Sequence, residues 1–137
     1  MDGSPNSQHA LRTAIDLAKA NRAELTILVV QPSPVRYVPT PVAPAPIPSD
    51  NEEVEAWARQ VIAESEALAR SEGVTEVEGV IDTGNPIEHI LSESVERNVD
   101  LIVMGARGLS PVARLLLGSV SDGVVHHAHC AVLIDKL

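Results

Sequence analysis

DLIVMGARG, residues 100–108, decides the fold together with Gly118-Ser119, which follows after nine intervening residues. Residues 101–104 are apolar in the manner of a buried strand, and the rest of the stretch is rich in glycine. Glycines let a backbone approach an anion closely, and a helix that starts after Gly118 would add unpaired N–H groups and the positive end of its dipole. The stretch therefore predicts a phosphate site between a strand and a helix, which favours a nucleotide as the ligand.

The two commonest nucleotide motifs do not occur in the sequence. There is no G-x-x-x-x-G-K-[ST], so the lysine that reaches the β- and γ-phosphates in a P-loop is missing, and there is no G-x-G-x-x-G. The S-G-G-x-D-S loop of ATP pyrophosphatases is absent as well. What remains is the spacing G-x2-G-x9-G-S, formed by Gly105, Gly108, Gly118 and Ser119.

Helical and strand patterns alternate along the chain. Apolar residues that recur every three or four positions predict helices, and short apolar runs predict strands. We expect helices from Ser4, over 50–72, over 85–98 and over 119–129, a short helical bridge at 110–117, and strands at 24–30, 74–81, 100–104 and 131–134. This alternation predicts an α/β fold with an open parallel sheet and right-handed crossovers.

The segment 32–48 interrupts the alternation, because it holds seven of the ten prolines. Proline donates no ladder hydrogen bond and breaks helices, so we predict an extended or disordered loop inside one domain. A linker between two domains is disfavoured, since the roughly thirty residues before it are too few for an independent core. Residues 1–137 are expected to form a single domain.

Composition limits the partners. A net charge of −9 disfavours nucleic acid and anionic membranes, which attract cationic surfaces. No apolar run approaches the roughly 20 residues that span a bilayer, no signal-peptide pattern is found, and the single cysteine, Cys130, cannot form an internal disulfide. We therefore expect a cytoplasmic protein. With no Phe, one Trp and one Tyr, an aromatic platform for stacking bases is not expected.

Two groups of residues have ordinary structural explanations. The run 119–122 also fits a capping box, in which Ser119 caps its own helix and Asp122 reaches back to it. Arg107 and Arg114 could give charge-assisted contacts to phosphate, although single surface arginines are more often solvated.

A metal site near the carboxyl end of the chain is not expected. His126, His127, His129 and Cys130 are residue types that bind zinc. Adjacent side chains on a helix point about 100° apart, so the first two cannot converge on one ion. A structural cysteine and surface histidines explain the run better.

The glycine spacing resembles the nucleotide-binding signature of the universal stress protein family. Asp2-Gly3-Ser4 is similar to the family's turn before its first helix, and residues 128–133 (AHCAVL) are similar to its ending, with Ala131 where proline is usual. The resemblance covers the chain from Asp2 onward. It implies an adenine nucleotide alpha hydrolase-like fold, with helices on both faces of a five-stranded sheet of order 3-2-1-4-5.

The resemblance also implies a ligand and the residues that bind it. The ligand would be ATP, with Mg²⁺ or Mn²⁺ held mainly by the phosphates. Asp2 and the backbone near Val30 would contact the adenosine, Gly105 and Gly108 would line the ribose and phosphates, and Gly118, Ser119 and Val120 would hold phosphate through N–H groups and the serine hydroxyl. Met104 and Arg107 complete the expected set.

One strand of that fold has no counterpart in the sequence. In the family a buried strand precedes the aspartate-glycine-serine turn and lies in the middle of the sheet, whereas here Met1 immediately precedes Asp2. The strands at 24–30 and 100–104 would lose their shared neighbour, at about 1–3 kcal/mol for each unpaired buried backbone group. We hypothesise that this chain begins late, at an internal methionine. The alternative is that the other strands close the gap or a partner chain supplies a strand.

Three functions are open at this point. The favoured one is an ATP-binding regulatory protein of the universal stress type with slow or no hydrolysis, because the motif region offers no lysine, no evident general base and no carboxylate pair suited to magnesium. The alternatives are an ATP-dependent hydrolase or transferase, whose second substrate binds under the loop 32–48, and a ligand-independent interaction module. The last strand is short, apolar and expected at a sheet edge, which predicts a symmetric homodimer.

Overall fold

The computed structural model describes residues 1–33, 35–48, 51–107 and 117–137. The helices are α1 (Pro5–Asn21), α2 (Glu52–Ser71), α3 (Pro86–Glu96) and α4 (Ser119–His127). The strands are β1 (Leu25–Gln31), β2 (Val35–Val38), β3 (Ala45–Pro48), β4 (Val77–Thr83), β5 (Leu101–Gly105) and β6 (Ala131–Asp135). In this part of the chain no helix is long and apolar enough to cross a membrane.

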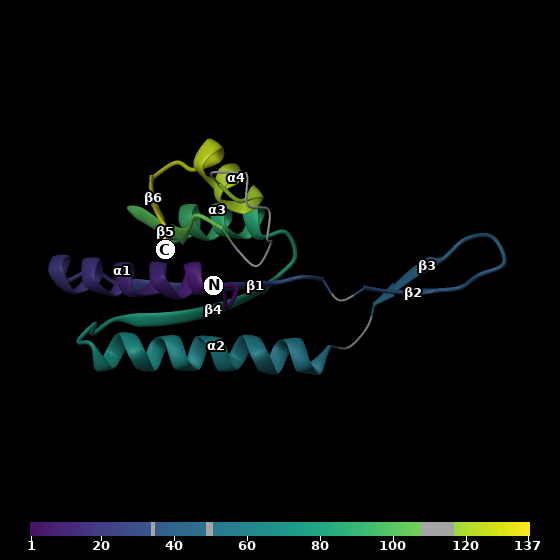
Figure 1. The fold of residues 1–137 in the computed structure, drawn as a ribbon, viewed down its shortest axis with the longest axis horizontal. Helices are drawn as coiled ribbons and strands as arrows, with labels where there is room; N and C mark the ends of the chain where they lie inside the picture. The colour runs from purple at the N-terminus through teal and green to yellow at the C-terminus, as the bar shows by residue number, and fades with distance from the viewer. Residues whose placement is uncertain (34, 49–50, 108–116) are drawn as a thin grey trace.

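Parallel strands form the middle layer of the molecule. β1 pairs with β4 in parallel, and β5 pairs with β6 in parallel. On one side α1 packs against β5 and β6 while α2 packs against β1 and β4, and on the other side α3 contacts α4 (Figure 1). The predicted α/β class, with parallel strands between helices, is confirmed.

Two helix starts follow the sequence signals that predict them. The Ser7 N–H donates to Ser4 Oγ (3.1 Å) at the start of α1, and the Ile87 N–H donates to Asn85 Oδ1 (2.9 Å) at the start of α3. Each helix has a proline in its first turn, where the missing N–H has no intrahelical partner. A cap of this kind stabilises a helix by about 1 kcal/mol.

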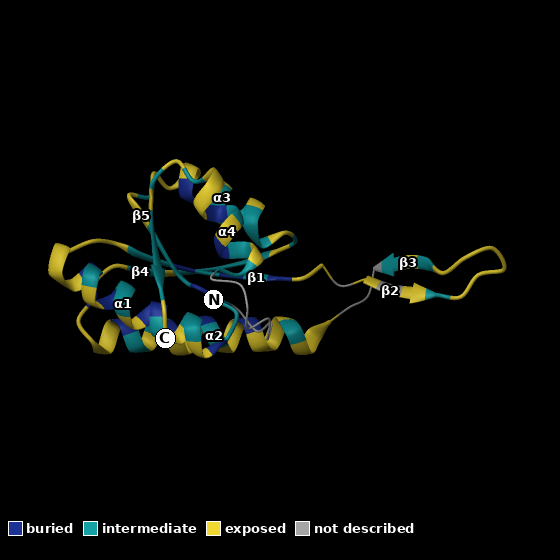
Figure 2. Ribbon diagram, turned by 45° about the horizontal axis from the view of Figure 1, so that its top comes forward, coloured by how far each residue is buried: buried dark blue, intermediate teal, exposed yellow. Residues whose placement is uncertain are grey.

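The hydrophobic core lies between β1 and the helices α1 and α2, whose buried residues face the strands (Figure 2). It consists of Leu11, Ile15, Ala18, Ile27, Val29, Ala58, Ile62, Ala69 and Val74. The three- and four-residue spacing of apolar residues predicts that Trp57 in α2 and Val95 in α3 face inward, but Trp57 is 39% exposed and Val95 is 54% exposed. In α3 the buried position is Ser94, and the next residue on a helix points about 100° away from it.

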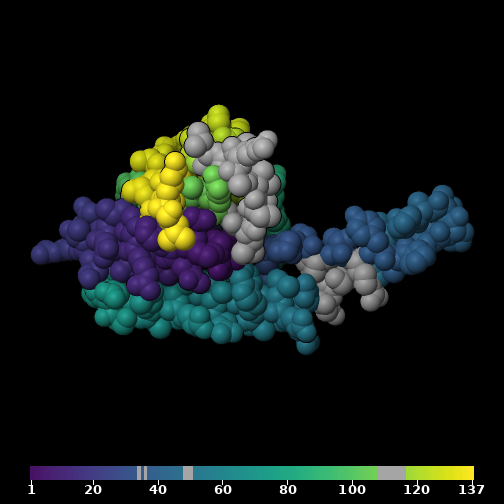
Figure 3. All heavy atoms as spheres, in the orientation of Figure 1, coloured from purple at the N-terminus to yellow at the C-terminus, as the bar shows by residue number. Residues whose placement is uncertain are grey.

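The sequence predicts an extended or disordered loop over 32–48, but part of this segment forms a hairpin. β2 and β3 pair antiparallel from Val35↔Pro48 to Val38↔Ala45. Proline is tolerated in a two-stranded ribbon because alternate N–H groups face away from the partner strand and need no ladder bond. Figures 1 and 3 show this hairpin standing away from the helices and the parallel strands, with Val42 95% exposed.

The two parallel pairs do not join into one sheet. Each is a separate two-stranded sheet, and no described strand lies between β1 and β5. The free edges of these two strands line one cavity of about 1780 Å³. In Figure 2, β5 runs at a steep angle to β1 and β4. The expectation that these strands lack a shared neighbour is confirmed in the part of the chain that the structure describes.

Candidate functional site

The carboxyl end of β5 meets the start of α1, and the residues before α1 reach the middle of β1. Gly105, the last residue of β5, lies against Asn6 in the first turn of α1. On the β1 side, the Met1 nitrogen donates to the Leu28 carbonyl. In parallel α/β proteins, ligands bind outside the carboxyl ends of the strands, where neighbouring crossovers diverge.

Most of the candidate nucleotide-binding residues predicted from the sequence line this cavity. Those that line it are Asp2, Val30, Met104, Gly105, Arg107, Gly118, Ser119 and Val120. Gly108 and Arg114, which were also singled out, lie outside the described residues, as does most of the expected bridge at 110–117. Segments far apart in the chain therefore converge on one space.

The start of α4 leaves N–H groups without a cap. Gly118 is the N-cap residue, and no described side chain caps the helix. The Gly118 N–H donates to the Ala106 carbonyl (2.7 Å), and the first bond within the helix runs from the Asp122 N–H to the Gly118 carbonyl (2.9 Å). Ser119 is the first helical residue, so the capping box in which it caps its own helix does not form. Phosphate contacts from backbone N–H groups would come from Ser119 and Val120, not from Gly118.

Ser121 fixes this helix start, although no motif in the sequence marks it for that role. Its buried hydroxyl donates to the Ala106 carbonyl (2.9 Å) and lies 3.0 Å from the Gly118 carbonyl. The Ala106 N–H in turn donates to the Asp135 carbonyl at the end of β6 (2.8 Å). Ala106 thus ties the end of β5, the start of α4 and the end of β6 together, and it holds the α4 N–H groups in place.

Packing explains one of the two described glycines of the motif and does not explain the other. A Cβ on Gly105 would lie 2.8 Å from Asn6 Cβ and 2.9 Å from the Asn6 carbonyl carbon, so packing against α1 already requires glycine there. A Cβ on Gly118 would lie 3.4 Å from its nearest described neighbours, and its φ of −75° suits any residue. The described protein atoms therefore do not account for Gly118.

The turn before α1 presents a carboxylate to the same cavity. Asp2 Oδ1 accepts a hydrogen bond from the Ser4 N–H (3.0 Å). Burial raises the pKa of this carboxyl, but hydrogen bonds from Ser4 and Ser7 and the neighbouring chain-terminal ammonium outweigh burial, so its pKa lies below the ordinary value. The Asp2 side chain is therefore an anion at neutral pH, suited to accept hydrogen bonds.

Trp57 lies beside this turn. A Cβ on Gly3 would come within 3.1 Å of Trp57 Cζ2, and Gly3 has a φ of +75°, a left-handed conformation that favours glycine. The helical pattern predicted a core position for Trp57. Its place next to Asp2-Gly3-Ser4 depends on the packing of α2 against α1, which no local pattern reveals. As the only tryptophan of the sequence, it offers a fluorescent signal from the neighbourhood of this turn.

The lowered pKa of Asp2 gives a pH prediction. A carboxyl whose pKa is lowered by folding stabilises the protein above its unfolded pKa, and this stabilisation is lost as the pH falls through the folded pKa. We expect Asp2→Asn to reduce the free energy of unfolding at neutral pH, and we expect the difference from the parent to shrink below about pH 4. Urea unfolding of the variant and the parent, from neutral pH to below about pH 4, measures this difference in the free energy of unfolding. The control is Asp16→Asn, at an exposed position of α1. A difference that stays constant with pH would contradict the role given to the charge.

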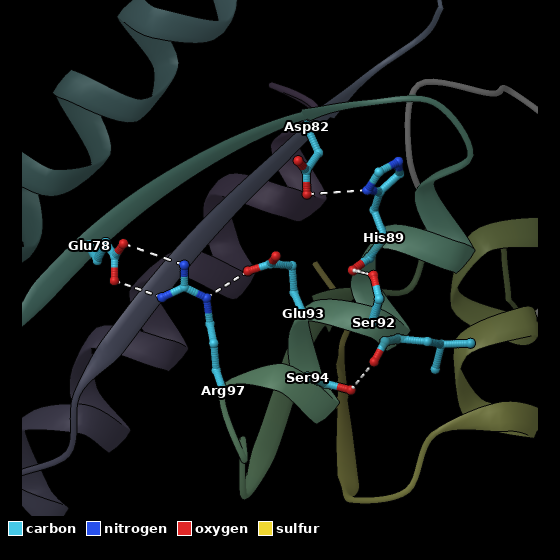
Figure 4. A network of polar contacts seen from close by, with 8 residues as sticks. Glu78, Asp82, His89, Ser92, Glu93, Ser94 and Arg97 are labelled. Carbon is cyan, nitrogen blue, oxygen red and sulfur yellow. Dashed lines mark hydrogen bonds and ion pairs between the residues drawn. The ribbon is translucent and has the colours of Figure 1, made fainter.

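A polar network joins β4 to α3 (Figure 4). The Arg97 guanidinium contacts Glu78 on β4 and Glu93 on α3, both at 2.6 Å, and this pairing holds the pKa of Glu78 below its ordinary value. Nearby, His89 Nδ1 lies 3.2 Å from Asp82 Oδ2. Arg97, Glu78 and Glu93 also line the cavity.

A model of the universal stress protein family matches residues 1–136. The chain belongs to this family. A relative in Bacillus subtilis, a universal stress protein, is 34% identical over 141 residues, which cover 99% of this chain and 95% of the relative.

Solved structures show the same fold. The universal stress protein UspA from Lactobacillus plantarum matches with a TM-score of 0.79 and 25% identity, over 98% of this chain and 92% of that one. A universal stress protein in complex with cAMP matches with a TM-score of 0.74 and 27% identity, over 99% of this chain and 91% of that one. This member of the family thus binds cAMP.

Proposed function

We propose that this protein is an ATP-binding regulatory protein of the universal stress type, with residues 1–137 acting as one nucleotide-binding domain. The observation that carries the proposal is the convergence of Asp2, Val30, Gly105 and Ser119 on one cavity at the carboxyl ends of β1 and β5. One side of this space offers a carboxylate, and the other offers the uncapped start of α4. A base and ribose on the first side and phosphates on the second match this distribution of charge.

The adenine base is supported by the relative that binds cAMP. The Asp2 carboxylate would accept hydrogen bonds from the sugar or base, and the backbone at Val30 would meet the adenosine. Because Arg107 lines the cavity, it would add a charge-assisted contact to the phosphates. A divalent Mg²⁺ or Mn²⁺ ion would be held mainly by the phosphates, since they carry the largest negative charge there.

Turnover would be slow or absent under this proposal. Phosphoryl transfer needs groups that position the nucleophile and neutralise the developing charge, and the glycine motif supplies neither a lysine nor an evident general base. Nucleotide binding would then change the shape or surface of the protein, and another protein would recognise that change. We place this activity in the cytoplasm.

A homodimer through β6 is part of the proposal. Among the described strands β6 pairs only with β5, so its other edge presents unpaired backbone groups. Two copies that pair β6 with β6 about a two-fold axis would satisfy both edges.

Equilibrium binding tests the proposal. The purified chain should bind ATP in a saturable manner, with a change in Trp57 fluorescence, and should bind GTP much more weakly. ADP release should stay well below about 1 s⁻¹, the lower end of ordinary enzyme turnover. Faster release would favour the ATP-dependent enzyme, and no affinity for ATP, AMP or cAMP would favour the interaction module; either result would overturn the proposal.

A further inference from the structure

The hairpin of β2 and β3 has its main contacts within itself. β2 packs against β3, and Figures 1 and 3 show the ribbon standing away from the helices and the parallel strands. Two side chains that alternate onto one face of β2 are largely exposed, Val35 by 49% and Tyr37 by 67%. A lone two-stranded ribbon is only marginally stable in water, because it has no core. The hairpin is therefore suited to a partner that covers it.

The outer edge of β3 offers no hydrogen-bond donor. Pro46 and Pro48 have no N–H group, so the residues of β3 that exchange ladder bonds with β2 are Ala45 and Ile47. The two prolines then occupy the alternate positions, whose backbone groups face away from β2. Because a further strand would find acceptors but no donors there, this edge is closed to pairing.

The outer edge of β2 is open as a result of the same alternation. Val35 and Tyr37 lie opposite the two prolines in the register, so their N–H and C=O groups point away from β3. Neither N–H group has a hydrogen-bond partner in the part of the chain that the structure describes. A further strand can therefore pair with this ribbon along β2 but not along β3.

The turn that joins the two strands is held by one of its own side chains. The Ala43 N–H donates to Thr40 Oγ1 (3.2 Å), and the Thr40 hydroxyl donates to the Ala43 carbonyl. The hairpin is thus preformed, which lowers the entropy that a partner must remove on binding. Residues 37–49 contain no charged side chain, so two copies of this stretch can approach each other without repulsion.

We propose that the hairpin joins two copies of this chain: β2 of one copy pairs antiparallel with β2 of the other about a two-fold axis. An open antiparallel edge is complementary to itself, because a two-fold rotation brings its donors onto its acceptors. The resulting sheet has the order β3-β2-β2-β3 and ends at the closed edge of each β3, so the pairing gives a closed assembly and not a fibre. It goes beyond the nucleotide site and the β6 edge and requires neither.

Two registers bring the open groups of the two β2 strands together. In one, Val35 lies opposite Tyr37, and the two Arg36 positions face each other, which places like charges directly opposite. In the other, Tyr37 lies opposite Tyr37 of the second copy, and these two residues exchange both backbone hydrogen bonds. Because Pro46 is the partner of Tyr37 within each hairpin, the face then carries a row of proline, tyrosine, tyrosine and proline. The second register avoids the repulsion and is the one assigned to the dimer.

The mass of the full chain in solution, measured by sedimentation equilibrium, tests the pairing. Tyr37→Pro removes the central N–H of the open edge and keeps the bonds to β3, because that N–H points outward. At equal concentration the variant should have about half the mass of the parent and the same affinity for ATP. Val42→Ser changes a side chain that is 95% exposed at the turn, and it should leave the mass unchanged.

A cysteine at the two-fold axis tests the register. Hydrogen-bonded positions on antiparallel strands have Cα atoms about 5.5 Å apart, within the range that a disulfide spans. In a chain with Cys130→Ser, which removes the native thiol, Tyr37→Cys should cross-link two copies under diamide at least about tenfold faster than Val42→Cys. Non-reducing gels measure both rates.

Three results would overturn the proposal. They are equal cross-linking rates at positions 37 and 42, a mass that Tyr37→Pro does not lower, and a parent chain that is monomeric. The last of these would leave the open edge of β2 to a strand of another protein. If Tyr37→Pro does not fold, the cross-linking rates still decide. A loss of ATP binding in the parent would count against the proposed function and not against the hairpin, since the two are measured separately.

Discussion

Replacing Ser119 with alanine is expected to weaken ATP binding by about 10- to 100-fold and to leave the midpoint of thermal unfolding unchanged. The reason lies in the start of α4. Ser119 is the first residue of the helix, and no described side chain caps it, so its hydroxyl is not part of the cap that holds the helix. A hydroxyl that donates to a charged phosphate contributes about 1.5–3 kcal/mol to binding, which sets the size of the loss.

Ser121→Ala is the matched control, since it removes the same atom two residues further on. The Ser121 hydroxyl is buried and donates to the Ala106 carbonyl, so its loss should lower the free energy of unfolding by about 1–3 kcal/mol. Gly118→Ala completes the set: a Cβ there stays 3.4 Å from the nearest described atoms, so any loss of affinity without loss of stability points to the ligand. Calorimetric titration with ATP and thermal unfolding of all three variants separate the effects.

An opposite pattern would contradict the assignment. If Ser119→Ala destabilises the fold as much as Ser121→Ala and keeps the parent affinity for ATP, then Ser119 has a structural role and the phosphate lies elsewhere. The Trp57 fluorescence gives an independent reading of the same titration, because the indole lies against Gly3, next to the proposed adenosine contact Asp2.

Local signals account for the parts of the fold that the sequence predicts. The caps Ser4 and Asn85 act on N–H groups two or three residues away, so their effect is readable from spacing alone. The spacing of Gly105 and Gly118 likewise predicts that the end of one strand and the start of one helix lie at the same site. The hairpin is the opposite case: its prolines argue against a ladder, but only pairing between Val35–Val38 and Ala45–Pro48 shows that they fit one.

Contacts between distant segments account for what the sequence does not predict. Trp57 reaches the turn at Gly3 because α2 lies beside α1, and Ser121 reaches Ala106 because β5 ends under α4. Neither contact is marked in the sequence by a periodic pattern or a motif. Gly79 is a third example, since nothing in its alternating neighbourhood shows that a helix presses on it.

Gly79→Ala is expected to reduce the free energy of unfolding by about 3 kcal/mol, a large effect for one added methyl group. The new Cβ would lie 2.1 Å from Ile62 Cγ2. Isoleucine in a helix holds one χ1 rotamer, so this methyl cannot turn aside, and α2 must move away from β4. That movement would open the core around Ile62 and lengthen the hydrogen bond from the Gly79 N–H to Glu66 Oε1, now 2.8 Å.

A double-mutant cycle with Ile62→Ala tests the cause. Ile62→Ala alone should destabilise by about 2–4 kcal/mol through the cavity that it leaves. Because it also removes the clashing methyl, the double variant should be more stable than the sum of the two single effects predicts, by about 1–3 kcal/mol. Gly123→Ala is the control: its Cβ would lie 2.5 Å from Ile87 Cδ1, the free end of a side chain that can rotate, and alanine favours the helix, so urea unfolding should show little loss. Strict additivity in the Gly79 and Ile62 cycle would mean that the backbone at Gly79, and not the contact with α2, sets the requirement for glycine.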